Sequence, residues 1–487
     1  MAIASTKPMK KRPSVVVNGF RNSIGTAALA LGGILSSVIV VRSLSISEYG
    51  KLSFYLWLAS AVSSLGLLAF PAGLTKVVSQ LYGAGEESDA EALIPWVGRI
   101  LFVVNVMLTA LILVVAYVGP SANRILLSLI AIGLLPGAMS RVINSRVLAR
   151  EQYSITMVAS IITSIVIFLG VIVTHLLHVG TAGYEVVLLS GGVVQFLVLF
   201  TASRGSVFLT FGGPDVSKYA RRLYLDYVVP STLAVLFDLV VWQRSEIYFL
   251  HRFSHYAELG YYSISYTLFA TFNLIGAALL NGLFPSASHD FGAGHMELLG
   301  HKSETGLRLA TFYSLPIAMA GIVVAPSVLN LFYGTHLVAA GPVARVLIIG
   351  IVPGALSVAM TLSLSAGGGV WSVVKVGFLL SLANLGLDLL LIPHSAAVGA
   401  ALANTLTQFG YAVAVLGVAF RKFALKMPWS WVWKCTGIGL LFPFGIPAAM
   451  RLAGFDGIPL LAGMLVGCAV YWLVLSRTRL ARNGLFV

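Results

Sequence analysis

Acidic residues lie within long apolar stretches of this sequence, among them Asp238, Glu246 and Asp388. An ionisable side chain is costly in such surroundings, so it either takes part in function or locks helices together through a hydrogen bond or an ion pair. The functional chemistry would be the binding of a proton or a small cation. Asp238 lies deepest in its stretch and is our first candidate for a coupling site, ahead of Glu246 and Asp388.

The basic residues that we consider as ligand-binding candidates lie inside or at the ends of the apolar stretches: Arg21, Lys76, Arg141 and Arg345. Guanidinium and ammonium groups are suited to bind the oxygens of an anionic ligand such as a phosphate. The alternative is that these long side chains extend to lipid headgroups, as basic residues at a membrane interface do. We keep all four as candidates for ligand binding.

Polar side chains without charge supply the remaining candidates: Asn22, Trp57, Asn273 and Asn281. Asn22 and Trp57 each lie on a polar face of an apolar stretch, which either lines a cavity or packs closely on another helix. Trp57 is too large for close packing, which favours a cavity. Asn273 and Asn281 either bind sugar hydroxyls or form hydrogen bonds across helices.

The composition indicates the solvent in which these residues act. Of the 487 residues, 58% are hydrophobic and only 10% are charged, and the mean hydropathy is +0.93. A soluble chain carries roughly 25% charged residues, so this chain cannot cover a water-exposed surface of its size. In lipid, every backbone polar group must be satisfied internally, and apolar stretches of about 20 residues suit helices. The composition therefore predicts an all-α integral membrane protein.

The apolar stretches predict about 14 transmembrane helices. We place them at residues 22–42, 53–82, 96–118, 124–144, 155–178, 184–203, 223–250, 262–287, 306–331, 341–366, 371–392, 396–420, 430–450 and 458–476. The connections are short, so we expect no soluble catalytic domain. Any activity must then reside within the helix bundle.

An internal repeat organises these helices. Residues 132–140 match residues 349–357, each with a Pro-Gly pair, and Gly50 corresponds to Gly260. Because each copy holds an even number of spans, the repeat predicts two parallel six-helix lobes, at 22–204 and 218–420, plus two appended helices at 430–476. Residues 1–21 form a basic tail, and residues 477–487 form a second tail. Two such lobes would enclose a cavity with alternating access.

The net charge of +14 follows the membrane topology. With alternate connections assigned to the two sides, 24 of the 31 Lys and Arg residues lie on the side of both tails and 6 on the other. Cytoplasmic connections carry such an excess, so both termini are predicted to be cytoplasmic. The sequence has no basic stripe with interleaved aromatic residues, which argues against nucleic-acid binding.

The sequence contains no pattern of metal ligands or catalytic groups. The two cysteines, Cys435 and Cys468, lie in or beside apolar stretches, and the nine histidines lack the spacing of a metal site. We therefore expect no metal site, no cofactor and no catalytic residue.

Short motifs in a fixed order resemble those of polysaccharide flippases. They are Ser-Glu-Tyr-Gly at 47–50, Leu-Gly-Tyr-Tyr-Ser at 259–263 and Asn-Leu-Gly-Leu-Asp at 384–388. Over about residues 20–420 the chain is similar to the O-antigen and exopolysaccharide exporter branch of the multidrug/oligosaccharidyl-lipid/polysaccharide exporter superfamily. It departs from that family at Ala-Gly-Gly-Gly, 366–369, where a basic residue often follows the first Gly.

That resemblance implies a flippase that moves undecaprenyl-diphosphate-linked oligosaccharide from the cytoplasmic to the outer leaflet of the bacterial inner membrane. It implies membrane lipids as partners, together with a polysaccharide polymerase and glycosyltransferases. Transport would be coupled to protons, sodium ions or the membrane potential. The alternative is a cation-coupled multidrug exporter of the same superfamily, which a cationic cavity disfavours. A membrane polymerase or glycosyltransferase is a remote alternative, because the outer loops are short.

The charge distribution generates a topology prediction. Fusions at Lys7 and Arg482 to a reporter that is active only in the cytoplasm should both be active, because both tails lie on the Lys- and Arg-rich side. A fusion in the connection at 119–123 should be inactive. An external location for either terminus would contradict an even number of spans.

Overall fold

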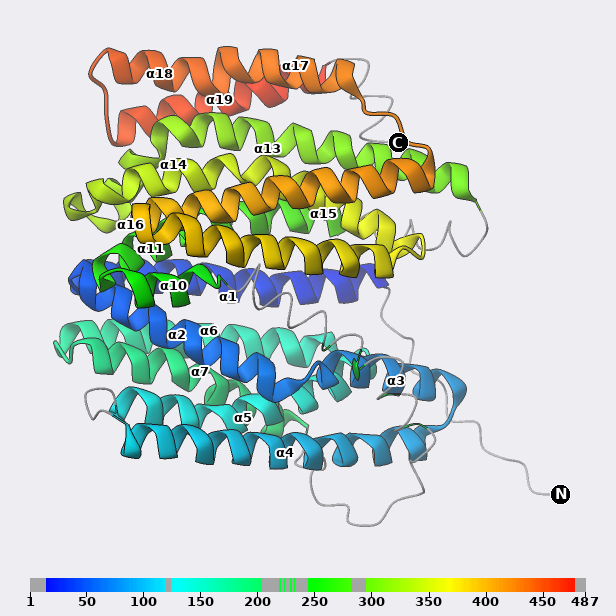
Figure 1. Cartoon of the computed structure of the whole chain (residues 1–487). Coiled ribbons are helices and arrows are strands. Elements are labelled where there is room, and N and C mark those ends of the chain that lie inside the picture. Colours follow the sequence, from blue (N-terminus) through cyan, green and yellow to red (C-terminus); the bar gives the residue numbers. More distant parts are fainter. Residues whose placement is uncertain are drawn as a thin grey trace. The chain divides into compact units, whose positions relative to one another are not determined.

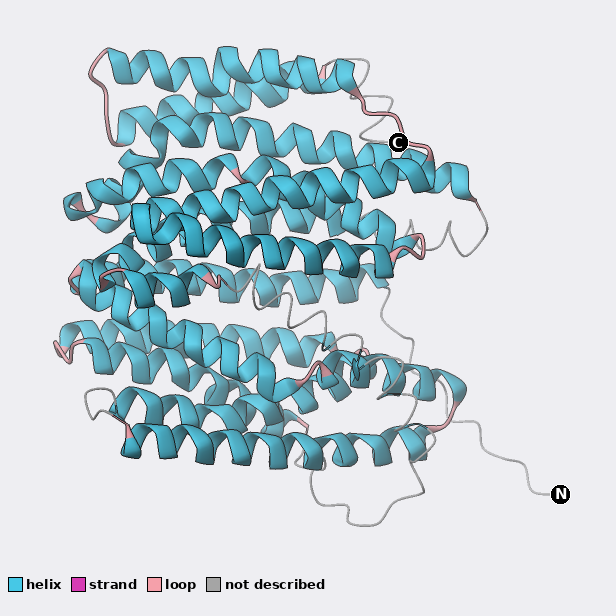
Figure 2. Ribbon diagram, viewed as in Figure 1, coloured by secondary structure: helices cyan, strands magenta, loops and turns pink. Residues whose placement is uncertain are grey.

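The structure, a computed structural model, describes residues 15–119, 124–203, 219, 223, 228, 229, 232, 244–281 and 295–477. Within these residues all regular elements are helices, as Figure 2 shows. Ten of these helices are long and apolar enough to cross a membrane, and a bent pair makes an eleventh span. Since one of the ten, α16 (Val370–Phe423), holds two predicted spans, twelve of the fourteen are accounted for. Helices α10 and α11 lie in the other two.

The chain forms two compact units, which Figure 1 labels by helix. The first unit comprises Met1–Val40 and Ala59–Thr232, and the second comprises Val41–Leu58 and Leu233–Val487. The first unit holds most of α1 (Val15–Ser43), the end of α2 (Ile46–Leu67), α3 (Phe70–Ala84), α4 (Glu87–Val118), α5 (Arg124–Ala149), α6 (Tyr153–Leu176) and α7 (Thr181–Ala202). The lobe boundaries inferred from the repeat stay a prediction.

The second unit holds the remaining described helices. They are α10 (Glu246–Phe253), α11 (Tyr256–Asn281), α13 (Met296–Tyr333), the 3-10 helix η3 (Thr335–Ala340), α14 (Gly341–Ile349), α15 (Ile351–Ala366), α16, α17 (Trp429–Gly439), the π-helix η4 (Leu440–Phe444), α18 (Gly445–Leu452) and α19 (Ile458–Ser476). Residues 41–58, from the end of α1 through the first half of α2, pack with this unit.

The stretch predicted as one span at 53–82 is a bent pair. The helix axis bends by 43° between α2 and α3. Leu68 and Ala69, which lie between the two helices, have positive φ values of 44° and 54°. Pro71 follows in the first turn of α3, where its missing N–H is not needed. The uniform polar face expected along this stretch is therefore interrupted at its middle.

Side chains of the first unit satisfy the carbonyl groups that the bend leaves free. Asn105 donates to the Gly66 carbonyl at 3.1 Å, and Thr232 donates to the Leu68 carbonyl at 2.8 Å. Ser145 donates to the carbonyl of Pro71 at 2.9 Å. Within a membrane these bonds allow a broken helix, because lipid offers no alternative partner.

Helix α16 is a hairpin of two spans, as the sequence predicted for 371–392 and 396–420. The break lies at Ala396, whose φ of 43° and ψ of −123° are not helical. The two legs approach so closely that a Cβ atom at Gly399 would lie 2.3 Å from the Leu391 carbonyl oxygen. The Glu258 carboxylate of α11 accepts a hydrogen bond from the Ala397 N–H at 3.2 Å, which caps the second leg.

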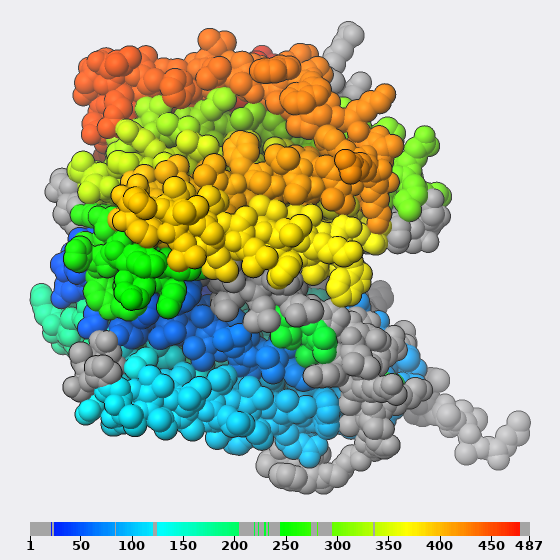
Figure 3. All heavy atoms as spheres, in the orientation of Figure 1, coloured from blue at the N-terminus to red at the C-terminus, as the bar shows by residue number. Residues whose placement is uncertain are grey.

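The last two spans, α17 to α19, pack along α13, and Figure 3 shows them in orange and red at one edge of the second unit. Trp431 is buried and donates to the Arg308 carbonyl at 3.1 Å. In the connection before α19, Asp456 accepts hydrogen bonds from the Ser327 hydroxyl and the Gly457 N–H, and these bonds lower the pKa of Asp456. Hydrogen bonds thus connect the appended spans to α13 at two positions along its length.

Residues 41–58 pack on α10 and α11 through two glycines that the repeat makes equivalent. A Cβ atom on Gly50 would lie 1.8 Å from the Tyr256 carbonyl oxygen, and one on Gly260 would lie 2.4 Å from that of Ile46. The neighbouring rings of Phe54 and His251 stack with centroids 3.9 Å apart. Only glycine allows the two backbones to approach this closely.

This contact predicts that Gly50→Ala destabilises the protein by about 1–3 kcal/mol, because the added methyl group forces the backbones apart. The matched control is Gly377→Ala, also inside a helix, where a Cβ atom would meet nothing within 4 Å. Alanine there should be neutral or stabilising by up to about 1 kcal/mol. Thermal unfolding of both variants in detergent checks this, and an unchanged midpoint for Gly50→Ala would contradict the close contact.

Candidate functional site

Two carboxylates lie together in the core of the second unit. Glu246 is the first residue of α10, and Asp388 lies in the first leg of α16. Both residues are 0% exposed. The sequence singled out both as coupling candidates, and the structure brings them into one hydrogen-bonded cluster.

A break in the backbone places Glu246. Arg244 has a φ of 65°, so the chain turns sharply just before α10 begins. The Arg244 guanidinium lies over the ring of Tyr266, 4.7 Å from its centroid, which stabilises the cation. Glu246 therefore lies at a helix N-terminus, whose dipole favours a negative charge.

Asn384 joins the two carboxylates. Its Nδ2 lies 3.2 Å from Asp388 Oδ2, 3.5 Å from Glu246 Oε1 and 3.1 Å from Ser245 Oγ. The Thr407 hydroxyl donates to Asn384 Oδ1 at 2.7 Å, which turns the amide nitrogen toward the acids. One amide thus bridges two acidic side chains.

Two more neutral donors complete the cluster. Ser245 Oγ donates to Asp388 Oδ2 at 2.8 Å, and Asn404 Nδ2 donates to Glu246 Oε1 at 3.1 Å. Within the described part of the chain, the hydrogen-bond partners of the two carboxylates are neutral groups. Burying two negative charges with neutral donors alone costs several kcal/mol, so a bound cation or proton would stabilise this arrangement.

One oxygen of each acid remains available to such an ion. Glu246 Oε2, Asp388 Oδ1 and Asn404 Oδ1 are all buried, and within the described part of the chain none has a hydrogen-bond partner. Carboxylate and amide oxygens are ligands for hard cations, and a carboxylate also accepts a proton. The described residues contain no group of three or more His, Cys, Asp or Glu side chains that could hold a metal ion. Two carboxylate oxygens and one amide oxygen form a small donor set of the kind that suits a proton or a monovalent cation.

Three of the four predicted basic residues belong to the other unit. Arg21 is half-buried, and Lys76 and Arg141 are exposed; all three belong to the first unit. Arg345, in the second unit, is exposed and donates from Nε to the Ile322 carbonyl at 3.2 Å. Their binding of a ligand stays a prediction.

The neutral candidates have different surroundings. Trp57 is half-buried with its ring centroid 6.0 Å from that of Phe54. Asn273 is half-buried and donates to the Phe269 carbonyl of its own helix at 3.3 Å. Asn22 and Asn281 lie in helices but their side chains, like the whole of Asp238, lie outside the described residues.

Sequence reasoning missed the residues that hold the acids in place: Ser245, Asn384, Asn404 and Thr407. Asn384 and Asp388 are four residues apart in an apolar stretch, so they share a helix face. Asn404 and Thr407 interrupt the next apolar stretch in the same way. This spacing was the available signal, but it did not show which helix would face Glu246.

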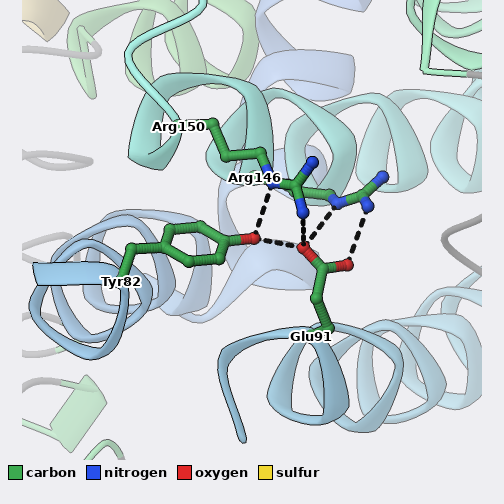
Figure 4. A network of polar contacts seen from close by, with 4 residues as sticks. All are labelled: Tyr82, Glu91, Arg146 and Arg150. Carbon is green, nitrogen blue, oxygen red and sulfur yellow. Dashed lines mark hydrogen bonds and ion pairs between the residues drawn. The ribbon is translucent and has the colours of Figure 1, made fainter. Parts of the chain in front are cut away.

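A second polar network lies in the first unit, where Figure 4 shows Glu91 of α4 between two arginines of α5. The Glu91 carboxylate forms ion pairs of 2.7 Å with both Arg146 and Arg150. Tyr82 of α3 donates to the same carboxylate and accepts from Arg150 Nε at 2.9 Å. Charge is compensated here, so this network links α3, α4 and α5 and leaves no open ligand position on the acid.

A model of the polysaccharide biosynthesis protein family matches residues 39–341. The chain belongs to this family. The match covers part of each predicted lobe. It includes Glu246 of the buried cluster and ends before Asp388. Among curated protein sequences, none matches the chain.

Solved structures share the fold. Lipid II flippase MurJ in an inward closed conformation is 14% identical with a TM-score of 0.77, over 93% of this chain and 98% of that one. An inward-facing multidrug resistance MATE family transporter is 13% identical with a TM-score of 0.65, over 83% and 98%. A transporter of the MOP superfamily from Pyrococcus furiosus is 14% identical with a TM-score of 0.60, over 84% and 95%.

These comparisons confirm the predicted family resemblance and the all-α membrane fold of about 14 helices. The chain is a multi-pass membrane protein with a flippase-like transporter fold. The similar structures are those of transporters and flippases. Because their identity to this chain is low, they establish the fold, and the ligand must be argued from the chain itself.

The buried cluster predicts that a cation stabilises the folded protein. Sodium ions, or protons at lower pH, should raise the unfolding midpoint, since a ligand at about 100 times its Kd contributes about 2.7 kcal/mol. Glu246→Gln and Asp388→Asn should each abolish that response. Glu185→Gln, which alters a buried acid of the first unit, should retain it. Equal responses in all four proteins, measured by thermal unfolding across sodium concentration and pH, would contradict ion binding by the pair.

Proposed function

We propose that this protein is a flippase that moves undecaprenyl-diphosphate-linked oligosaccharide from the cytoplasmic to the outer leaflet of the bacterial inner membrane. The observation that carries the proposal is membership of the polysaccharide biosynthesis protein family in a chain with a flippase-like transporter fold. A sugar linked to a diphosphate cannot cross hydrocarbon unaided, so its passage needs a polar path inside a protein.

The distribution of charge supports an anionic cargo. Arg21, Lys76 and Arg141 all belong to the first unit and are exposed or half-buried, so they are accessible to a ligand. We infer that they bind the diphosphate in the predicted cavity. A guanidinium group bonds phosphate oxygens in pairs, whereas an ammonium group acts as a point charge, so Arg and Lys make different contributions.

The two acids of the second unit supply the coupling in this proposal. A proton or sodium ion bound by Glu246 and Asp388 neutralises a buried negative charge, and its release restores that charge. The two states of the cluster differ in their cost of burial, so ion binding favours one packing of the surrounding helices. Differential affinity of this kind is what links an ion gradient to a change of access.

Cation-coupled multidrug export is the alternative, since a MATE transporter has a similar fold. The two functions differ in the charge of the cargo. A cationic drug would be repelled by Arg21, Lys76 and Arg141, whereas an anionic diphosphate would be attracted. The proposed partners are the lipid-linked oligosaccharide, membrane lipids, a polysaccharide polymerase and glycosyltransferases, with both termini in the cytoplasm.

The proposal predicts that Arg141→Ala, and Ala variants of Arg21 and Lys76, reduce glycan export by about tenfold or more where a phosphate contact of about 1.5–3 kcal/mol is lost. Arg124→Ala is the matched control, because Arg124 is an exposed arginine at the opposite end of the same helix, α5. Arg141→Lys should be as harmful as Ala if the contact is bidentate.

A complementation assay in a strain that lacks the flippase gene measures export, with membrane expression checked for each variant. Full export from the variants at 21, 76 and 141 would remove the cationic-cavity mechanism. Dye efflux that depends on Glu246 and Asp388, with no glycan export, would favour the multidrug exporter instead.

A further inference from the structure

The ion-pair network of the first unit gathers more hydrogen-bond donors than one carboxylate can use well. Arg146 bonds both oxygens of Glu91, from Nε to Oε1 at 3.2 Å and from Nη2 to Oε2 at 2.7 Å. Arg150 Nη2 and the Tyr82 hydroxyl also donate to Oε1, as Figure 4 shows. Oε1 thus receives three donors, although a carboxylate oxygen has only two lone pairs to offer.

A phosphate group suits this donor set better than a carboxylate does. Guanidinium groups bond carboxylate and phosphate oxygens in the same paired geometry, so Arg146 can hold either anion. A diphosphate has more acceptor oxygens than a carboxylate, and they are spread over two phosphorus atoms. The donors that now crowd one oxygen of Glu91 would each find an oxygen of their own.

The network is open to solvent on one side. The side chains of Glu91 and Arg150 are 34% and 36% exposed, whereas that of Arg146 is 12% exposed. A ligand can therefore reach the two guanidinium groups from outside the helices, at the position that the carboxylate occupies. No cavity inside the bundle is needed.

Apolar packing holds the backbone on which the network is built. Ala90 and Ile94 of α4, Val147 of α5 and Leu81 of α3 are at most 5% exposed and belong to one hydrophobic cluster. Interiors of this kind are close-packed, so the three helices keep their places when a half-exposed side chain moves. The guanidinium groups are thus arranged in advance for an anion that replaces the carboxylate.

The arginine pair lies at the end of α5 that the charge distribution assigns to the cytoplasm. Arg146 and Arg150 are four residues apart, so they share a helix face. Arg141, proposed above to bind the diphosphate, is about 7.5 Å nearer the middle of the same helix. An anion at the pair would therefore be held just before it reaches Arg141.

We propose that Arg146, Arg150 and Tyr82 form a site for the diphosphate of a lipid-linked sugar, which Glu91 occupies when no lipid is bound. The inference rests on the function proposed above and adds the place where the cargo is first held. Diphosphate oxygens accept the hydrogen bonds that Glu91 accepts in the ligand-free protein, and the carboxylate turns to solvent. Glu91 itself has a structural role, since it connects α3, α4 and α5 until the lipid binds.

Farnesyl diphosphate, a short prenyl diphosphate, is the probe for this site. Its equilibrium binding is measured with the full-length protein in nanodiscs of neutral phosphatidylcholine, and farnesol controls for the prenyl chain. Glu91→Gln should bind farnesyl diphosphate about tenfold more tightly, because the competing negative charge is removed. Since Glu91 competes only at its own arginines, tighter binding identifies this site and not the basic residues proposed for the cavity.

The arginines should respond in the opposite direction. Arg146→Gln should weaken binding about tenfold or more, because the paired contact to the phosphate is lost. The matched controls are Arg99→Gln and Glu87→Gln, which alter an exposed arginine and an exposed acid of α4. Both controls should bind as the unaltered protein does, and thermal unfolding checks that every variant is folded.

Glu91→Asp decides the question if Glu91→Gln does not fold. It keeps the negative charge, but its shorter side chain withdraws the carboxylate from the arginines, so binding should tighten several-fold. Unchanged or weaker binding in a folded variant at position 91 is the result expected of a network that only joins helices, and it would overturn the site. Unchanged binding in Arg146→Gln would overturn it as well.

The source of the phosphate and the proposed function are tested separately. Phosphatidylglycerol in the nanodiscs should leave the binding of farnesyl diphosphate almost unchanged; complete competition would assign the site to phospholipid headgroups instead. Binding with the expected pattern, but no glycan export by the unaltered protein in cells, would remove the flippase function and leave the diphosphate site. Glycan export with unchanged binding in Arg146→Gln would remove the site and leave the flippase.

Discussion

Burying a polar group in hydrocarbon without a hydrogen-bond partner costs free energy, and this constraint explains both the packing of the helices and the candidate site. Lipid offers no hydrogen bonds, and at the bend between α2 and α3 the Gly66 and Leu68 carbonyl groups accept hydrogen bonds from the side chains of Asn105 and Thr232. The same cost makes the unpartnered oxygens of Glu246 and Asp388 informative. On two neighbouring carboxylates, such oxygens indicate a place for a ligand.

Two acidic networks show how compensation of charge separates a structural role from a functional one. Glu91 is paired with two arginines and a tyrosine, so its charge is balanced and its role is to connect three helices. Glu246 and Asp388 receive only neutral donors, with Arg244 directed at the Tyr266 ring instead. A balanced acid has no reason to bind an ion, whereas an unbalanced pair gains from doing so. The coupling proposal depends on this difference.

The internal repeat allows equivalent positions of its two copies to be compared, and the copies agree at some positions and differ at others. Gly50 and Gly260 are equivalent and both lie against a backbone carbonyl, so there the repeat carries the same packing requirement twice. Gly137 and Gly354 are also equivalent, yet among the described residues amide side chains lie within 4 Å of an added Cβ atom at Gly354 and none does at Gly137. Divergence at equivalent positions is expected where one copy has acquired chemistry that the other does not need. The polar side chains near Gly354 and the acid pair, from Glu246 to Asn273, are such a difference.

Sequence alone determined the all-helical membrane fold, because the length of apolar stretches and the scarcity of charge leave no other stable arrangement in lipid. It also identified Glu246 and Asp388, since an acid in an apolar stretch is conspicuous by its cost. Only the tertiary structure decided that these two share Asn384, that span two is bent, and that Asn404 bonds Glu246. Residues 246 and 388 are distant in the chain, and helical periodicity records which face a residue occupies but not which helix that face will meet.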